Sequence, residues 1–163
     1  MKNSLIIIAL IVVPISHSIA SGYNADPGKD SLLNVLMVKI KAEYPDLLIK
    51  AEEADYQSYS YIGHIINEDS VVIYRIMSIQ AKLKNSSSPI KKLLVFSPEK
   101  YLGCYDIDAS QIMPQRILNH KYLIFDYKVE GQPKKTKINF QLALPEHFKV
   151  EEHEYYFNIY LPK

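Results

Sequence analysis

The 163-residue sequence contains no tryptophan, only one cysteine, Cys104, and only five glycines. A single cysteine excludes an intramolecular disulfide, so the fold depends on its apolar core. The few glycines exclude collagen-like and glycine-rich repeats. An excess of charge of one sign is also missing, because 19 basic residues face 18 acidic ones and the net charge is +1. The sequence therefore lacks the basic footprint of a nucleic-acid-binding protein, and we expect no nucleic-acid partner.

Motifs of the common enzyme families are missing as well. The sequence contains no P-loop, no G-x-S-x-G or H-E-x-x-H motif, no paired C-x-x-C and no dinucleotide-binding pattern. Cys104 lies in YLGCYDI, which resembles a strand and shows no signature of a cysteine nucleophile. We interpret it as a small buried strand residue. The sequence thus predicts no catalytic residue and no cofactor.

The N-terminus has the features of a secretory signal peptide. Lys2 precedes an apolar run over residues 5–15. This run of about eleven residues fits a signal peptide and falls short of the ~20 residues that span a membrane. Small residues at Ser18 and Ala20 favour cleavage after Ala20. We predict a signal peptide over residues 1–20, a periplasmic or secreted protein, and no stable membrane anchor after cleavage.

The remaining chain is predicted to form one domain. Residues 21–29 are polar and contain a Pro-Gly pair, which is typical of a mobile lead. Residues 30–163 form the predicted domain, which is of ordinary size. Its first element is a helix that Asp30 or Ser31 caps and that runs to about Glu43.

Beyond this helix the hydrophobic pattern changes to a period of two, which is typical of strands. Two strands flank the polar residues 67–70 and predict a β-hairpin with a four-residue loop. About seven strands with short connections follow one another, which favours antiparallel pairing. The predicted fold class is α+β, with the N-terminal helix packed on a curved, mostly antiparallel sheet that either stays open or approaches a barrel.

Tyrosine is unusually frequent, with thirteen residues, and is a favoured residue of protein interfaces. If Ile66 pairs with Val71, strict alternation places Tyr59, Tyr61 and Tyr74 on one face of the hairpin. Polar neighbours suggest that Tyr59 is more exposed than Tyr74. We therefore predict Tyr59 and Tyr61 as binding residues, with Tyr74 structural; the alternative is that these tyrosines are core residues.

Arg75 falls on the opposite face of this hairpin, with Met77 and Ile79. Both faces are rich in apolar residues, so we expect both to be covered, and the helix can cover only one. The favoured interpretation of Arg75 is an ion pair with a carboxylate. The alternative is a binding residue at the mouth of a cavity that holds an anionic ligand.

Histidines and carboxylates are densest in PEHFKVEEHEYY, which includes His147 and His153. Imidazole and carboxylate groups bind zinc and other divalent metals. The five-residue gap between the two histidines matches no strong metal motif, so we interpret the segment as a solvated acidic loop and predict no metal site.

Three classes of function fit these observations. The first is an exported, non-enzymatic protein-binding module, such as an inhibitor, an immunity protein or an envelope accessory protein, with a protein partner. The second is a carrier that encloses a small apolar or anionic ligand between helix and sheet. The third is an enzyme of unrecognised type. The absence of catalytic motifs and the abundance of tyrosine favour the first class.

Overall fold

One helix precedes nine strands in the part of the chain that the computed structural model describes, residues 27–107 and 112–161. The predicted signal peptide and most of the predicted lead, residues 21–29, lie outside this part. The helix is α1 (Pro27–Glu43), and the short 3₁₀ helices η1 (Pro45–Leu47) and η2 (Ala51–Glu53) follow it. Helix α1 begins a few residues before the predicted cap, since proline is well tolerated in a first turn. It ends at the predicted residue.

The strands form two antiparallel sheets. They are β1 (Ala54–Ile66), β2 (Val72–Leu83), β3 (Ile90–Phe96), β4 (Tyr101–Asp106), β5 (Arg116–Leu118), β6 (Tyr122–Val129), β7 (Gln132–Asn139), β8 (His147–Val150) and β9 (His153–Ile159). One sheet has the order β1-β2-β3-β4-β9-β8 and the other the order β5-β6-β7. The predicted α+β class is confirmed. The larger sheet stays open, with β1 and β8 at its edges, and does not close into a barrel.

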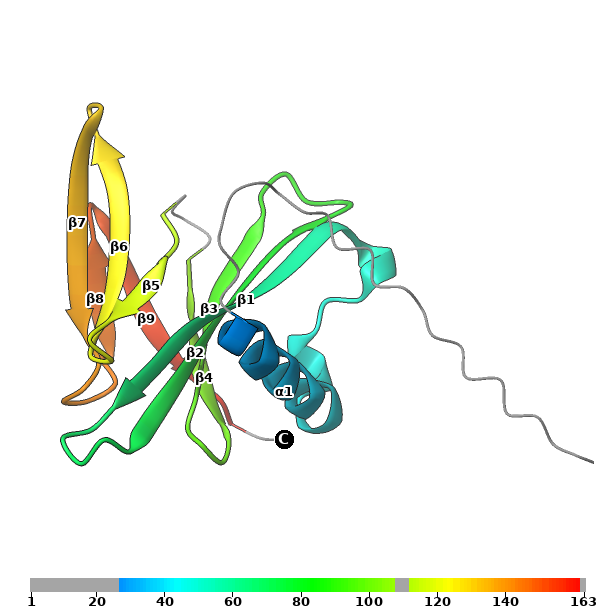
Figure 1. The fold of residues 1–163 in the computed structure, drawn as a ribbon. Helices are drawn as coiled ribbons and strands as arrows, with labels where there is room; N and C mark the ends of the chain where they lie inside the picture. The colour runs from blue at the N-terminus through cyan, green and yellow to red at the C-terminus, as the bar shows by residue number, and fades with distance from the viewer. Residues whose placement is uncertain (1–26, 108–111, 162–163) are drawn as a thin grey trace, which may run out of the picture.

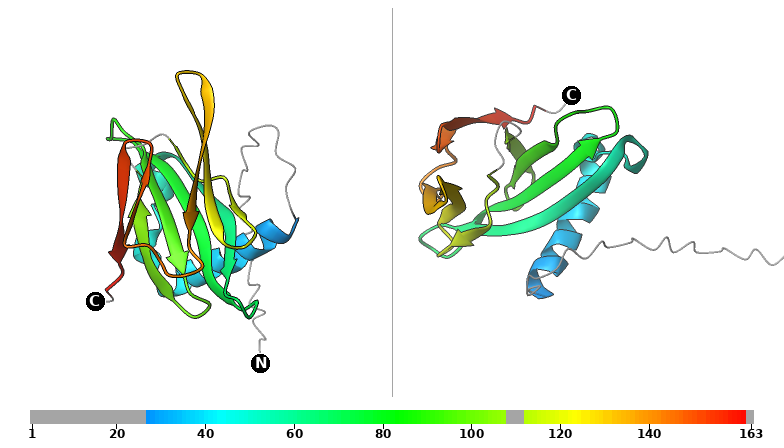
Figure 2. Two further views of the ribbon diagram at one scale, coloured as in Figure 1. Left: turned by 90° about the vertical axis from the view of Figure 1, so that its left-hand side faces the viewer. Right: turned by 90° about the horizontal axis from the view of Figure 1, so that it is seen from above.

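The described elements form layers on both sides of strands β1–β4 (Figure 1). Helix α1 crosses one face of these strands, and strands β5–β9 lie on the other side (Figure 2). The predicted hairpin between β1 and β2 is confirmed, with its turn at residues 67–70.

Two separate apolar cores result from this layering. The helix core lies between α1 and the sheet and consists of Leu36, Ile40, Tyr61, Met77, Ile79, Leu94, Phe96, Tyr101 and Cys104. The inter-sheet core lies on the opposite face and consists of Ile62, Ile65, Ile76, Leu93, Val95, Tyr105, Ile107, Leu123, Phe125, Phe140, Phe148, Val150 and Tyr155. The expectation that both faces of the hairpin are covered is confirmed.

A β-bulge interrupts the alternation of side chains in β1. Tyr61 pairs with Met77 and Gly63 pairs with Ile76, so Ile62 is an extra residue without a partner across the ladder. A bulge of this kind transfers all side chains that follow it to the opposite face. The sequence pattern before the bulge and the pattern after it therefore cannot be read in one register.

The prediction that Tyr59, Tyr61 and Tyr74 share one face is wrong because of this bulge. Tyr61 is part of the helix core and Tyr59 packs against it, whereas Tyr74 packs against the inter-sheet core. The register at the turn also differs, since Ile66 pairs with Val72.

Strand β4 also contains a bulge, at Leu102. Val95 pairs with Gly103, whereas Phe96 pairs with Tyr101. As a result, Tyr101 and Cys104 both belong to the helix core, although strict alternation would place them on opposite faces. Cys104 is buried and is not part of a disulfide, as the sequence predicted.

Candidate functional site

Arg75 lies directly across the ladder from His64, on the face of the sheet that also contains the helix core. The Arg75 residue is partly exposed, and its guanidinium donates a hydrogen bond to the carbonyl oxygen of Pro98 at 3.4 Å. Among the described residues it forms no ion pair with a carboxylate, so the favoured sequence interpretation is not found. A guanidinium has five N–H donors, and within the described residues the bond to Pro98 engages one of those of Arg75.

The imidazole of His64 stacks on that of His120, with ring centroids 4.6 Å apart and an angle of 24° between the planes. His120 lies in the turn between β5 and β6, where both Asn119 and His120 adopt positive φ, 52° and 51°. The backbone N–H of Ile66 donates a 3.0 Å hydrogen bond to the carbonyl oxygen of His120. This bond fixes the turn against the end of β1 and brings the two histidines together.

Tyr61 is the buried member of this group. Its side chain is 7% exposed, and its hydroxyl lies 3.3 Å from Nδ1 of His64. Burial raises the pKa of Tyr61 to about 12, against a smaller opposing effect of Arg75. The phenol is therefore protonated at neutral pH and can donate to the imidazole.

The pKa of His64 is lowered from its ordinary value. Burial is the largest cause, and the neighbouring His120 and Arg75 add to it because each disfavours a further positive charge. His64 is accordingly neutral near pH 7, and its Nδ1 shares a hydrogen bond with the hydroxyl of Tyr61.

We call Tyr61, His64, Arg75 and His120 the His–Arg cluster. Its side chains are donors or bases, and among the described residues none of them forms an ion pair. The sequence placed Tyr61 on the wrong face and gave no sign that His120 lies beside His64. The one available signal was Asn119, because asparagine tolerates the left-handed conformation that a tight turn requires.

Tyr59, the second predicted binding tyrosine, is half-buried and linked to its surroundings. Its hydroxyl accepts a 3.4 Å hydrogen bond from the backbone N–H of Ile49 and donates to Oε1 of Gln57 at 3.1 Å. These bonds attach the segment between α1 and β1 to the strand. The roles of Tyr59, Tyr61 and Arg75 in binding remain predictions, and the structure brings Tyr61 and Arg75 into one cluster.

The first part of β1, residues 54–61, forms what we call the open edge. Within the described chain its backbone hydrogen bonds go only to β2. The side chain of Tyr56 is 45% exposed, and Ser58 and Ser60 are exposed beside it. Tyr56 was not among the predicted site residues, because alternation alone does not report exposure at an edge.

The other edges of the two sheets differ from the open edge. Strand β5 has three residues and β8 has four. Strand β7 has eight, and its exposed residues include Pro133, Lys134, Lys135 and Lys137. Short length, proline and lysine are among the features by which proteins prevent strand pairing at an edge. β-Bulges are another, and β1 has them at Asp55 and Ile62, on either side of residues 56–61. From Tyr56 to Ser60 the open edge contains none of these.

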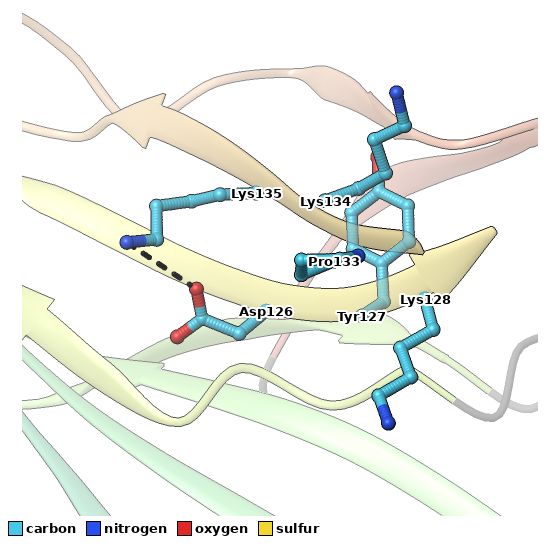
Figure 3. A pocket seen from close by; sticks show the side chains of 6 residues that line it. All are labelled: Asp126, Tyr127, Lys128, Pro133, Lys134 and Lys135. Atoms are coloured by element: carbon cyan, nitrogen blue, oxygen red, sulfur yellow. Dashed lines mark ion pairs between the residues drawn. The ribbon is translucent and has the colours of Figure 1, made fainter. Parts of the chain in front are cut away.

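An open hollow of about 570 Å³ lies on the hairpin of β6 and β7 (Figure 3), lined by Asp126, Tyr127, Lys128, Pro133, Lys134 and Lys135. Asp126 forms ion pairs with Lys135 at 3.6 Å and with Arg116 at 2.8 Å. The hollow lies on a projecting hairpin, away from the space between helix and sheet where the carrier interpretation places a ligand. Residues of the helix core fill that space.

The segment with His147 and His153 forms the β8–β9 hairpin and not the acidic loop that the sequence suggested. His147 pairs with Tyr156 and stacks on its ring, with centroids 5.7 Å apart, whereas His153 pairs with Val150. Across residues 27–107 and 112–161 there is no group of three or more His, Cys, Asp and Glu side chains placed to hold a metal ion.

Comparison with known proteins identifies no relative of this chain. No protein-family model, no curated protein and no solved structure matches the chain. Within the described residues no helix has the length and apolar character to cross a membrane.

Proposed function

We propose that the chain is an exported, non-enzymatic protein-binding module, and that it binds an extended segment of a different protein along the open edge of β1. The observation that supports this proposal is the contrast between the edges of the two sheets. Of the four edge strands, β5 and β8 are short and β7 contains proline and lysine. The open edge of β1 is long and contains neither proline nor lysine.

Backbone chemistry defines the kind of partner. An edge strand presents a row of N–H and C=O groups that another extended chain can satisfy, which is the basis of strand addition. In that mode the backbone supplies affinity, and alternate side chains supply specificity. Tyr56, Ser58 and Ser60 lie on one face of the open edge and are exposed, whereas Gln57 and Tyr59 lie on the other and are half-buried.

The length of the free edge limits the partner segment. Beyond Tyr61, the turn at His120 and the side chain of Ile117, 3.1 Å from where a Cβ on Gly63 would lie, cover β1. At about 3.3 Å per residue, residues 54–61 accommodate a partner strand of about seven or eight residues. A strand of this length is common in globular proteins.

A displayed library of random peptides tests the binding mode. We expect selected peptides to protect the amides of residues 54–61 from hydrogen exchange. A Ser58→Lys/Ser60→Lys variant should lose about tenfold or more in affinity, because lysine at an edge opposes strand addition. A Ser31→Lys/Ser87→Lys variant adds the same charge at exposed positions on α1 and in the β2–β3 loop, and should bind normally.

Two results would contradict this proposal. One is a set of peptides that bind the edge variant as well as the parent and protect another surface. The other is a dimer of this chain in sedimentation that the edge variant abolishes, because the occupant of the edge would then be a second copy.

Export is tested separately by expressing the full chain in a secreting bacterial host. We expect mass spectrometry of the released protein to show Ser21 at the N-terminus, since the apolar run is short and Ser18 and Ala20 permit cleavage. A membrane-bound product that begins at Met1 would overturn this part of the proposal.

A further inference from the structure

We infer that the His–Arg cluster is a binding site for the phosphate group of a small soluble molecule. The inference is independent of the partner proposed for the open edge, because it concerns a different part of β1 and needs no second protein. It rests on four side chains from three segments that the fold brings to one place: Tyr61 and His64 on β1, Arg75 on β2 and His120 in the β5–β6 turn.

The charges of the cluster suit a dianion. Arg75 is permanently cationic, and two histidines can each add a positive charge. Acidic residues on adjoining segments are Glu68 and Asp69 in the β1–β2 turn and Glu99, which follows Pro98; in the described chain none of them forms an ion pair with the cluster. A cationic cluster that forms no ion pair with a carboxylate of the protein can neutralise the charge of a bound anion.

The donors of the cluster also suit a phosphate group. Arg75 retains N–H groups beyond the one that bonds Pro98, and guanidinium binds phosphate oxygens in pairs. A protonated His64 and a protonated His120 each supply further N–H donors. The donors come from neighbouring positions on two strands and a turn, and we infer that they bond different oxygens of one tetrahedral group.

The partial burial of the cluster strengthens such an interaction. His64 and Arg75 are half-buried, His120 is exposed, and Tyr61 closes the inner side. Charges that are partly shielded from water interact more strongly than fully solvated ones. The exposed ring of His120 leaves the group accessible from solvent.

The pH dependence of binding combines the titration of the cluster with that of the phosphate group. Protonation of His64 is opposed by burial, His120 and Arg75, while Tyr61 is neutral. A bound dianion favours the protonated rings. Protonation of the rings strengthens binding as pH falls, whereas protonation of the phosphate group, whose second pKa is about 6, weakens it. Binding should therefore be strongest at about pH 6–7 and weaken on either side.

The test follows the ring protons of His64 and His120 by NMR at pH 6. Inorganic phosphate and glycerol phosphate are added separately, and chloride keeps the ionic strength constant. We expect saturable shifts of both rings and an increase in the apparent pKa of His64. Equal affinity for the two probes would mean that the phosphate group alone is recognised; tighter binding of glycerol phosphate would mean that the ester group contributes.

Two variants make the test specific. Arg75→Gln should weaken phosphate binding by about tenfold or more, and Arg116→Gln should leave it unchanged, because Arg116 is paired with Asp126. Thermal unfolding checks that both variants fold. The inference is overturned if the shifts increase linearly without saturation, if acetate at equal ionic strength produces the same shifts, or if folded Arg75→Gln binds phosphate like the parent.

Discussion

Gly103 faces the backbone of Asn158 so closely that a side chain at position 103 would overlap the carbonyl group of Asn158. The contact joins β4 to β9, where Gly103 pairs with Ile159 and Cys104 with Asn158. Gly103 also has a φ of +151°, a conformation that residues with a Cβ rarely adopt. The pairing of the two strands thus requires glycine at this position.

Gly103→Ala should consequently destabilise the domain by about 2–4 kcal/mol, because backbone strain and overlap add together. The matched control is Gly131→Ala, where φ is +79° and no atom lies within 4 Å. That change should cost only about 1–2 kcal/mol, from the conformation alone. Guanidinium unfolding of the two variants measures the difference. Equal losses would mean that β4 and β9 are not in close contact.

Cys104 should be unreactive in the folded protein, because it is buried in the helix core. We expect a thiol reagent to label it only after denaturant is added. Cys104→Ala should lower the unfolding free energy by about 1 kcal/mol through lost packing. Rapid labelling of the native protein would contradict the burial and would reopen the question of a reactive thiol.

Two tyrosines on β1 should respond differently to truncation. Tyr61 is buried under α1, so Tyr61→Ala should cost about 3–5 kcal/mol, as for other large aromatic residues in cores. Tyr56 is largely exposed, and Tyr56→Ala should change stability by no more than about 0.5 kcal/mol. Thermal melts of both variants check this. Early unfolding of Tyr56→Ala would place Tyr56 in a core and remove it from the open edge.

Stability should fall as pH is lowered from about 7.5 to 5 in chloride buffer. The pKa of His64 is depressed in the folded state, so the unfolded chain binds the proton first and is favoured below its ordinary value of 6.5. His64→Asn should reduce this dependence, whereas His147→Asn, at an exposed position on β8, should not. Urea midpoints across the pH range measure it. An unchanged slope in His64→Asn would show that other groups cause the acid sensitivity.

Elements with a simple period could be predicted from the sequence. The helix, the hairpin turn at residues 67–70 and the α+β class depend on local hydrophobic patterns and turn residues. The faces of the strands could not, since Ile62 and Leu102 are bulged and each shifts the alternation by one residue. Gly63 and Gly103 follow these residues, and glycine inside a strand is the sequence signal of a bulge.

The His–Arg cluster could not be predicted from such patterns either, for a different reason. His64 and His120 are far apart in the sequence and meet because the β5–β6 turn packs on the end of β1. No periodicity or spacing reports how two sheets are placed against one another. The apolar neighbours of Arg75 in the sequence mark it as unusual, but only the fold places it beside His64 and Pro98.

The division into two cores has a consequence for how the domain unfolds. Leu93 belongs to the inter-sheet core and Leu94 to the helix core, although they are consecutive residues of one strand. Loss of either core would leave the same backbone without support on one side. The two layers should therefore melt in a single cooperative transition, and the amides of β3 should exchange with solvent only through global opening of the molecule.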